Sequence, residues 1–155
     1  MKQKKIVIGC DNAAVDMKNL VISELAARGV ACEDVGVDAA SDGTFYPLVA
    51  KRVCERIIES GYQDEGILLC GTGIGMAMTA NKFKGIFAAV CHDNFSAERA
   101  RLSNDANVLC MGARVIGPEL ARKILDEWLQ RHYEPNERSH PKVEAMRDID
   151  SANMK

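Results

Sequence analysis

Short apolar runs and amphipathic stretches alternate along most of this chain of 155 residues. Five runs have the length and composition of strands: KKIVIGC (4–10), GVACEDVGV (29–37), GILLC (66–70), GIFAAVC (85–91) and NVLCMG (107–112). Between them, apolar residues recur at helical spacing, as Met17, Val21 and Leu25 do before Gly29. Parallel strands need crossover connections that are usually helices. The alternation therefore predicts a doubly wound α/β fold, a five-stranded parallel sheet with helices on both faces.

Proline and small polar residues indicate where several helices begin. Pro47 and Pro118 suit the first turn of two helices, of which the second is expected to run through Trp128. Ser96 is expected to be the N-cap of a helix over SAERARL, and another helix is expected over residues 76–83.

The composition changes after His132. YEPNERSHPK (133–142) has two prolines and no apolar run, so an extended, exposed segment is expected there, with a short helix over residues 143–155. The sequence thus predicts an α/β domain over residues 1–132 and a C-terminal extension over residues 133–155. Such an extension either docks on a neighbouring subunit or frays into solvent, and the residues alone leave both open.

Charge and cysteine content exclude several classes of protein. The net charge of -2 provides no global field for nucleic acid or for an anionic membrane. No apolar run approaches the length of a membrane span, and the first residues carry too much charge for a signal peptide. Six cysteines without CxxC or zinc-like spacing predict no metal site and fit a reducing cytoplasm. Most of them are expected to be small buried apolar residues.

One of these cysteines has an unusual setting, because Cys70 ends a strand and is followed by GTGIG. Sites in parallel α/β sheets lie at the carboxyl ends of strands, and glycine-rich turns before helices bind anions through backbone N–H groups. The same partial charges favour a thiolate. A dinucleotide-binding turn lacks its GxGxxG spacing here. His92 either lines the site or caps a strand, whereas His132 and His140 are read as surface residues.

The stretch CGTGIGMAMTANKFKGIFAAVCHDNFSAERARLSNDANVLCMGARVIG (70–117) resembles the core of the ribose-5-phosphate isomerase type B family. That family also includes the galactose-6-phosphate isomerase subunits. The similarity extends to GCDNAA (9–14), to FYP (45–47) and to the basic tail, so it covers nearly the whole chain.

The resemblance implies a Rossmann-like fold and an enzyme that interconverts aldose and ketose phosphates through a cis-enediolate, without metal or organic cofactor. The implied reaction is the isomerisation of ribose 5-phosphate and ribulose 5-phosphate, a step of the pentose phosphate pathway. Tetrulose 4-phosphate and a hexose 6-phosphate such as galactose 6-phosphate are the alternative substrates. A non-catalytic sugar-phosphate-binding protein is the alternative of a different class.

The resemblance also implies roles for individual residues. Cys70 is the proton-transfer base, because Met76 stands where some members have a catalytic glutamate. The other implied contacts are Thr72 and the N–H groups of Gly71, Gly73 and Gly75 for the enediolate; Asp11, Tyr46 and Asn104 for the sugar; and Arg114 for the phosphate. Arg138 and Lys142 of the partner subunit would complete the phosphate site. A homodimer with shared sites follows, and whether two dimers form a tetramer is left open.

Two positions depart from the family pattern. Asn12 replaces a histidine that would contact the phosphate, and Ser103 replaces the histidine assigned to opening the sugar ring. A serine hydroxyl cannot exchange a proton near neutral pH as an imidazole does. Either Asp11 or His92 opens the ring, or the substrate needs little opening. A tetrose 4-phosphate meets the second condition, because the hydroxyl that would close its furanose ring is esterified.

Overall fold

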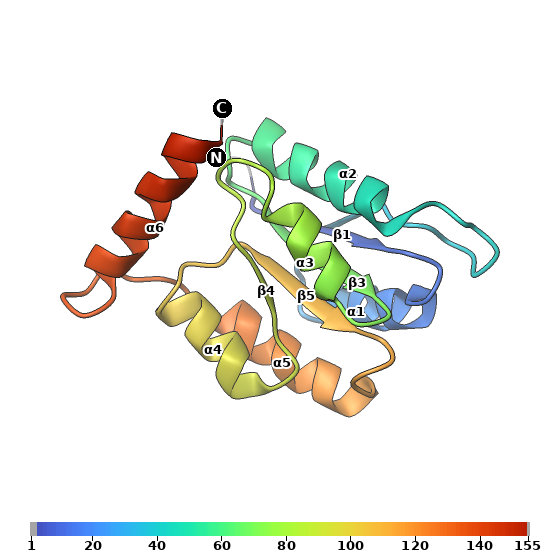
Figure 1. Cartoon of the computed structure of the whole chain (residues 1–155). Helices are drawn as coiled ribbons and strands as arrows, with labels where there is room; N and C mark the ends of the chain where they lie inside the picture. The colour runs from blue at the N-terminus through green and yellow to red at the C-terminus, as the bar shows by residue number, and fades with distance from the viewer. Residues whose placement is uncertain (1–2, 155) are drawn as a thin grey trace.

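Five parallel strands form one sheet in the order β2-β1-β3-β5-β4 in the computed structural model, which describes residues 3–154 (Figure 1). The strands are β1 (Ile6–Cys10), β2 (Cys32–Asp34), β3 (Glu65–Cys70), β4 (Ala88–Val90) and β5 (Val108–Gly112). The helices are α1 (Val15–Ala27), α2 (Tyr46–Glu59), α3 (Ile74–Ala80), α4 (Asn94–Leu102), α5 (Pro118–Gln130) and α6 (His140–Asn153). The predicted doubly wound α/β fold is confirmed.

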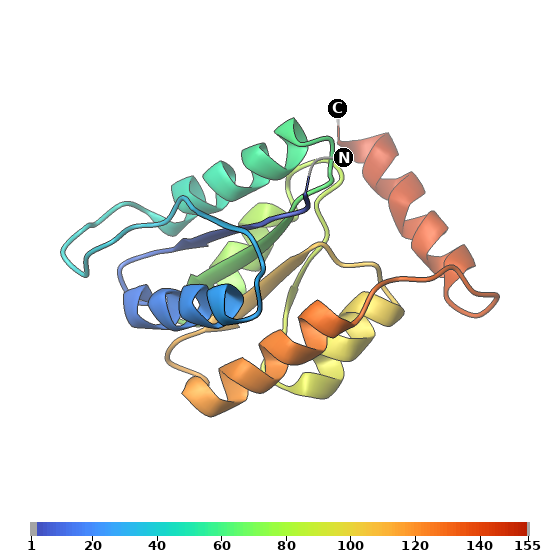
Figure 2. The same ribbon diagram turned by 180° about the vertical axis from the view of Figure 1, so that it is seen from behind.

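Two layers of helices cover the sheet. Helices α2 and α3 pack on one face, and α1, α4 and α5 lie together on the other, as Figure 1 and the reverse view in Figure 2 show. Every residue of β1 and β3 is buried, because both strands have strand neighbours on each side and helices above and below. This explains why their sequences are continuous apolar runs rather than alternating ones.

The strand order reverses between β1 and β3. From β1 the chain passes to β2 at one edge of the sheet and then returns to β3 on the other side of β1. Strand β4 forms the opposite edge, and β5 is inserted between β3 and β4. In open α/β sheets a crevice forms outside the carboxyl ends of the strands at such a reversal, and ligands bind there. The topology therefore predicts a ligand site at the residues that follow Cys10 and Cys70.

The amino end of β3 is tied to the helices beneath it by a buried arginine. The guanidinium of Arg101 in α4 contacts the carboxylate of Glu65 and lies 4.4 Å from the ring centroid of Trp128 in α5. It also donates to the carbonyl oxygens of Ala106 and Arg131, at 2.8 and 3.0 Å. These contacts join β3, α4 and α5 at the end of the sheet opposite Cys70.

The structure corrects the predicted cap of α4. Ser96 is not the N-cap, because the helix starts at Asn94 and Asp93 caps it. The carboxylate of Asp93 accepts hydrogen bonds from the Ser96 backbone N–H at 2.6 Å and from the Ser96 hydroxyl at 2.7 Å. Ser96 is therefore a partner of the cap rather than the cap itself.

The C-terminal helix also begins earlier than predicted. Helix α6 starts at His140, with Pro141 in its first turn, so part of the stretch expected to be extended is helical. The helix contacts the α/β domain of its own chain. Val143 is buried, Arg147 forms an ion pair with Asp105, and Asp150 accepts a hydrogen bond from the Gly85 N–H at 2.9 Å.

Among residues 3–154, no helix has both the length and the apolar composition that a membrane span requires.

Candidate active site

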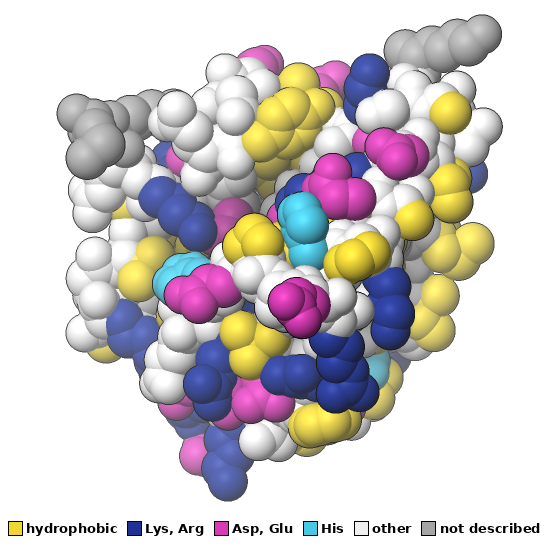
Figure 3. Space-filling view, turned by 90° about the vertical axis from the view of Figure 1, so that its left-hand side faces the viewer, with side chains coloured by type: hydrophobic (Ala, Val, Ile, Leu, Met, Phe, Trp, Pro, Cys, Tyr) yellow, Lys and Arg dark blue, Asp and Glu magenta, His cyan; other side chains and the backbone are white. Residues whose placement is uncertain are grey.

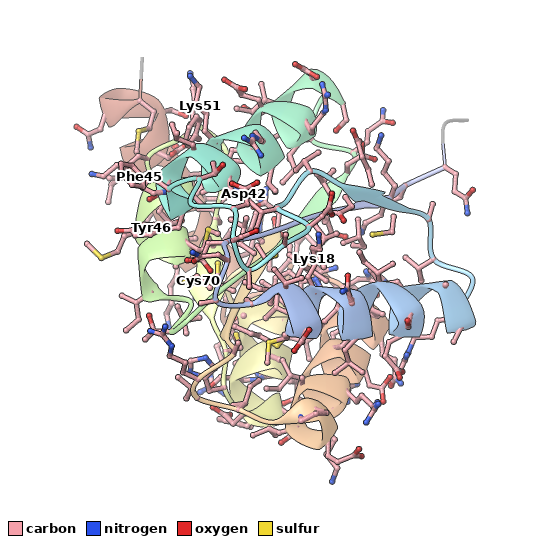
Figure 4. All side chains as sticks on the ribbon, turned by 90° about the vertical axis from the view of Figure 1, so that its right-hand side faces the viewer. Lys18, Asp42, Phe45, Tyr46, Lys51 and Cys70 are labelled. Carbon is pink, nitrogen blue, oxygen red and sulfur yellow. The ribbon has the colours of Figure 1, made fainter. Side chains whose placement is uncertain are left out.

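The carboxyl ends of the strands bring together residues from separate parts of the sequence. Figure 4 views the molecule from this side, with Cys70 at the end of β3 and Tyr46 and Phe45 at the start of α2. Asp11 directly follows β1, and its backbone N–H donates to the carbonyl of Leu69 at 3.2 Å. The fold thus brings Asp11, Tyr46 and Cys70, which the resemblance assigns to one site, to the same edge of the sheet.

Cys70 is set apart from the other buried cysteines by its hydrogen bonding. Its side chain is in a residue only 5% exposed, and Sγ accepts a hydrogen bond from the backbone N–H of Gly73 at 3.1 Å. An N–H donated to sulfur stabilises negative charge on that atom. The thiols of Cys10 and Cys91 instead donate, to the carbonyls of Val37 and Ala89. Burial raises the pKa of Cys10 and Cys91 to about 11 and that of Cys54 to about 12, so these residues stay protonated at neutral pH.

Each of the three glycines after Cys70 has its own structural reason. Gly73 caps α3 with a positive φ of 77°, a conformation that favours glycine. A Cβ at Gly71 would lie 3.2 Å from Nη1 of Arg114, and a Cβ at Gly75 would lie 2.5 Å from the ring of Tyr46. The motif thus lets Arg114 and Tyr46 approach the turn closely.

The end of β5 supports this turn from behind. Cys70 pairs with Gly112 in the sheet, and the Ala113 and Arg114 N–H groups donate to the carbonyls of Cys70 and Gly71 at 2.9 and 3.0 Å. The backbone of the turn is therefore held on the strand side.

Asp11 and Asn12 line a pocket of about 410 Å³ together with the segment from Gly43 to Pro47. The carboxylate of Asp11 accepts from the Ala13 N–H at 3.0 Å, which fixes it in a tight turn before α1. The wall formed by Gly43 and Thr44 was not predicted from the sequence, because a polar turn before a helix has no pattern that marks it as part of a site.

His92 has its ring fixed by a backbone hydrogen bond. Nε2 accepts from the Gly112 N–H at 2.9 Å, so the neutral ring carries its proton on Nδ1. Burial lowers the pKa of His92, which favours this neutral form. The structure shows the strand-cap role, and a ring in this state has no free lone pair with which to act as a base. Contact of His92 with the substrate stays a prediction.

The remaining predicted residues lie elsewhere. Ser103 and Asn104 follow α4, which runs back from the carboxyl end of β4, and they line a groove of about 1050 Å³ with Arg138 and Lys142 of the tail. The strands point away from this region and from α6 in Figure 1. Figure 3 views the molecule from the α6 side, where several Lys and Arg side chains gather. One chain therefore carries the predicted residues in two separate groups.

Arg99 also lines this groove and was missed by sequence reasoning. Its Nη1 donates to the Ser103 hydroxyl oxygen at 3.2 Å across one turn of α4. The spacing of four residues was the available signal, because side chains four apart on a helix are neighbours.

Among residues 3–154, no group of three or more His, Cys, Asp or Glu side chains is placed to hold a metal ion.

Comparison with known proteins identifies the family. Residues 6–146 match the family model of the Ribose/Galactose Isomerase family. D-erythrulose-4-phosphate isomerase of Pectobacterium atrosepticum is 49% identical over 139 residues, 90% of each chain, and ribose-5-P isomerase B of Listeria innocua is 46% identical over 149 residues, 96% of this chain and 99% of that one. The chain belongs to the ribose/galactose isomerase family, as the resemblance of residues 70–117 predicted.

A solved structure supports the same assignment. The type B ribose 5-phosphate isomerase of Leishmania infantum superposes with a TM-score of 0.90 at 35% identity, over 99% of this chain and 100% of that one. The agreement extends over the whole α/β architecture.

The hydrogen bond between His92 and Gly112 predicts a pH-dependent contribution to stability. Because burial lowers the pKa of His92 in the folded protein, the stability contributed by its neutral form is complete above the unfolded pKa of about 6.5. This contribution is lost as the pH falls below that value and through the lower pKa of the folded protein. His92→Ala should lower the free energy of unfolding by about 1 kcal/mol at pH 8. Denaturant unfolding at pH 5 should show a smaller difference between the two proteins.

His92→Gln is the control, because an amide oxygen can accept the Gly112 N–H at either pH. This variant should gain stability relative to the wild type as the pH falls. An equal difference between wild type and His92→Ala at both pH values would contradict the assignment.

Proposed function

We propose that this protein is a cofactor-independent aldose–ketose isomerase of sugar phosphates, with Cys70 as the proton-transfer base. The observation that carries the proposal is the Cys70 thiol in the glycine turn, with its sulfur accepting the Gly73 N–H, beside Asp11 and Tyr46 at the switch point of the sheet. The sugar-phosphate isomerases among its relatives support the same class of reaction.

The chemistry follows from these groups. The Cys70 thiolate removes the proton from C2 of the open-chain aldose, and the electrons move toward O1 to give a cis-enediolate. The proton returns to C1, and a proton passes from O2 to O1, which leaves the ketose with no net change in composition. Because the Gly73 N–H is already donated to sulfur, the N–H groups of Gly71 and Gly75, with Thr72, are left to stabilise the oxygen. Each such donor is typically worth about 10²–10³ in rate.

The phosphate site is the part of the proposal that needs a second chain. Arg114 lies against the glycine turn, whereas Arg138 and Lys142 lie in the groove on the α6 side. A homodimer in which the C-terminal extension (133–155) of one subunit reaches the turn of the other unites these residues in one site. The six free cysteines fit the cytoplasmic location that the sequence predicts.

The identity of the sugar depends on ring opening. Ser103 is bound to Arg99 and offers no titrating group, and His92 is held as a neutral strand cap. Asp11 is then the remaining candidate for ring opening. These observations favour a substrate that is already open, a tetrulose 4-phosphate, over ribose 5-phosphate.

A substrate panel tests both the reaction and this preference. The kcat/KM for tetrulose 4-phosphate should exceed that for ribose 5-phosphate by about 10²-fold, the lower range of general acid–base assistance. Ser103→His should raise the ribose 5-phosphate rate and leave the tetrulose 4-phosphate rate nearly unchanged. A hexose 6-phosphate completes the panel.

Each outcome of the panel is informative. Binding of sugar phosphates without conversion of any of them would replace the enzyme with a sugar-phosphate-binding protein. A wild-type preference for ribose 5-phosphate that Ser103→His does not improve would contradict the argument from ring opening.

The shared site is tested by mixing two inactive proteins. A hybrid of Cys70→Ala and Arg138→Ala subunits contains one site with both residues intact, so a one-to-one mixture should recover up to about a quarter of wild-type activity. Mass spectrometry confirms that subunits have exchanged. Activity that stays at the level of the separate variants after exchange would contradict a shared site.

A further inference from the structure

Lys18 is a buried cation that the proposed chemistry does not use. Its residue is 1% exposed, and Nζ contacts three oxygens: the Val37 carbonyl at 2.6 Å, Asp34 Oδ2 at 2.8 Å and Asp38 Oδ1 at 2.9 Å. The ammonium has three N–H donors, so all of them are used. Burial alone lowers the pKa of Lys18, but the hydrogen bonds to Asp34 and Asp38 outweigh this effect and raise it, so the charge is kept.

The three acceptors belong to one segment that continues β2 along β1. The Val35 N–H donates to the Ile8 carbonyl at 2.9 Å and the Val37 N–H to the Cys10 carbonyl at 3.2 Å. Gly36 lies so close to β1 that a Cβ there would be 2.6 Å from the Cys10 nitrogen. The residue that follows Cys10 is Asp11, so this segment is packed directly beside the strand end that bears the proposed site.

Beyond Asp38 the chain leaves the body of the protein. In the part of the chain that the structure describes, residues 39–44 form hydrogen bonds within the loop, such as those from the Thr44 N–H and hydroxyl to Asp42. In Figure 4 Lys18 lies between α1 and the loop that carries Asp42. The loop is therefore anchored at its start by Lys18 and at its end by Tyr46, whose ring rests against Gly75.

Lys18 thus connects the two walls of the pocket that Asp11 and Asn12 line with residues 43–47. Asp11 and Asn12 form one wall and lead directly into α1, on which Lys18 sits, while Thr44 and Tyr46 form the other. Movement of the loop relative to α1 would change the distance between these walls. The ammonium opposes such movement by holding the start of the loop against α1.

Stability alone does not call for a lysine at this position. Replacing a buried ion pair by an apolar side chain of similar volume is often neutral or stabilising, whereas charged contacts fix a specific geometry. We propose that Lys18 is a positioning residue that sets the width of the substrate pocket between Asp11 and Tyr46. This inference rests on the proposed isomerase function, because the pocket matters only if the substrate occupies it.

Steady-state kinetics of Lys18→Met tests the inference on the full-length protein, with tetrulose 4-phosphate and ribose 5-phosphate as substrates. Because the pocket walls bind the sugar, we expect KM to rise roughly 10–100-fold while kcat falls much less. Lys18→Arg keeps the charge and should recover part of the loss. The effect of Tyr46→Ala on KM should be much smaller in the Lys18→Met background than in the wild type, because the loop is already displaced.

Lys5→Met is the matched control. Lys5 pairs with Glu33 at 2.7 Å and joins the same two strands at their other end, far from the pocket. The Lys5→Met variant should have the KM of the wild type. If Lys18→Met also leaves KM unchanged, or if its effect adds fully to that of Tyr46→Ala, the positioning role is wrong although the isomerase stands.

Two further results are also decisive. If the wild type converts no sugar phosphate, the proposed function fails and this inference fails with it. If Lys18→Met does not fold, Asp38→Ala takes its place, because the Asp38 side chain is 88% exposed and its loss removes a single contact of the ammonium. Asp38→Ala should raise KM by about threefold or more, and an unchanged KM would overturn the proposal.

Discussion

The burial of β3 on both faces and both edges is the constraint on which the site depends. Strands β1 and β5 flank it, and the register pairs Cys70 with Gly112, so the last residue of β3 has a fixed neighbour. The turn that follows is held by backbone hydrogen bonds from Ala113 and Arg114. A thiol placed at this point is positioned by a strand that is buried along its whole length, and the glycines of the following turn bring N–H groups and side chains close.

The same topology explains why the predicted site residues fall into two groups. Helix α4 starts at the carboxyl end of β4 and must return to the amino end of β5, so Ser103 and Asn104 lie away from Cys70. The tail follows α5 on that side, and α6 is fastened there by Arg147 and Asp150. A second copy of the chain is the simplest way to bring Arg138 and Lys142 to the turn beside Arg114, and this is the basis for proposing a shared site.

The features that the sequence predicts well are those with a local physical cause. Uncharged apolar runs identify β1, β3 and β5, prolines mark the starts of α2 and α5, and the turn after Cys70 is predicted by its glycines. Two helix starts are misplaced although their causes are also local. Asp93 caps α4 in place of Ser96 because its carboxylate reaches two donors of that serine, and α6 begins at His140 because a proline is compatible with the first turn of a helix.

The site is predicted only in part. The placement of Asp11 and Cys70 at one edge follows from strand ends that any parallel sheet brings together, whereas Tyr46 was assigned to the site only by the family resemblance. The contacts of Lys18 with Val37 and Asp38 depend instead on how the segment after β2 packs against α1. No pattern in the sequence specifies that packing.

The most direct test of the central claim is whether Cys70 moves the proton. In deuterated solvent, wild type should introduce deuterium at C1 or C2 of the substrate during isomerisation, because the enediolate exchanges with solvent through the base. Cys70→Ser should stay folded and still bind sugar phosphate, yet exchange should fall by about 10³-fold, because a serine hydroxyl is far too weak an acid to serve as the base. Exchange that persists at the wild-type rate in Cys70→Ser would contradict the assignment of Cys70 as the base.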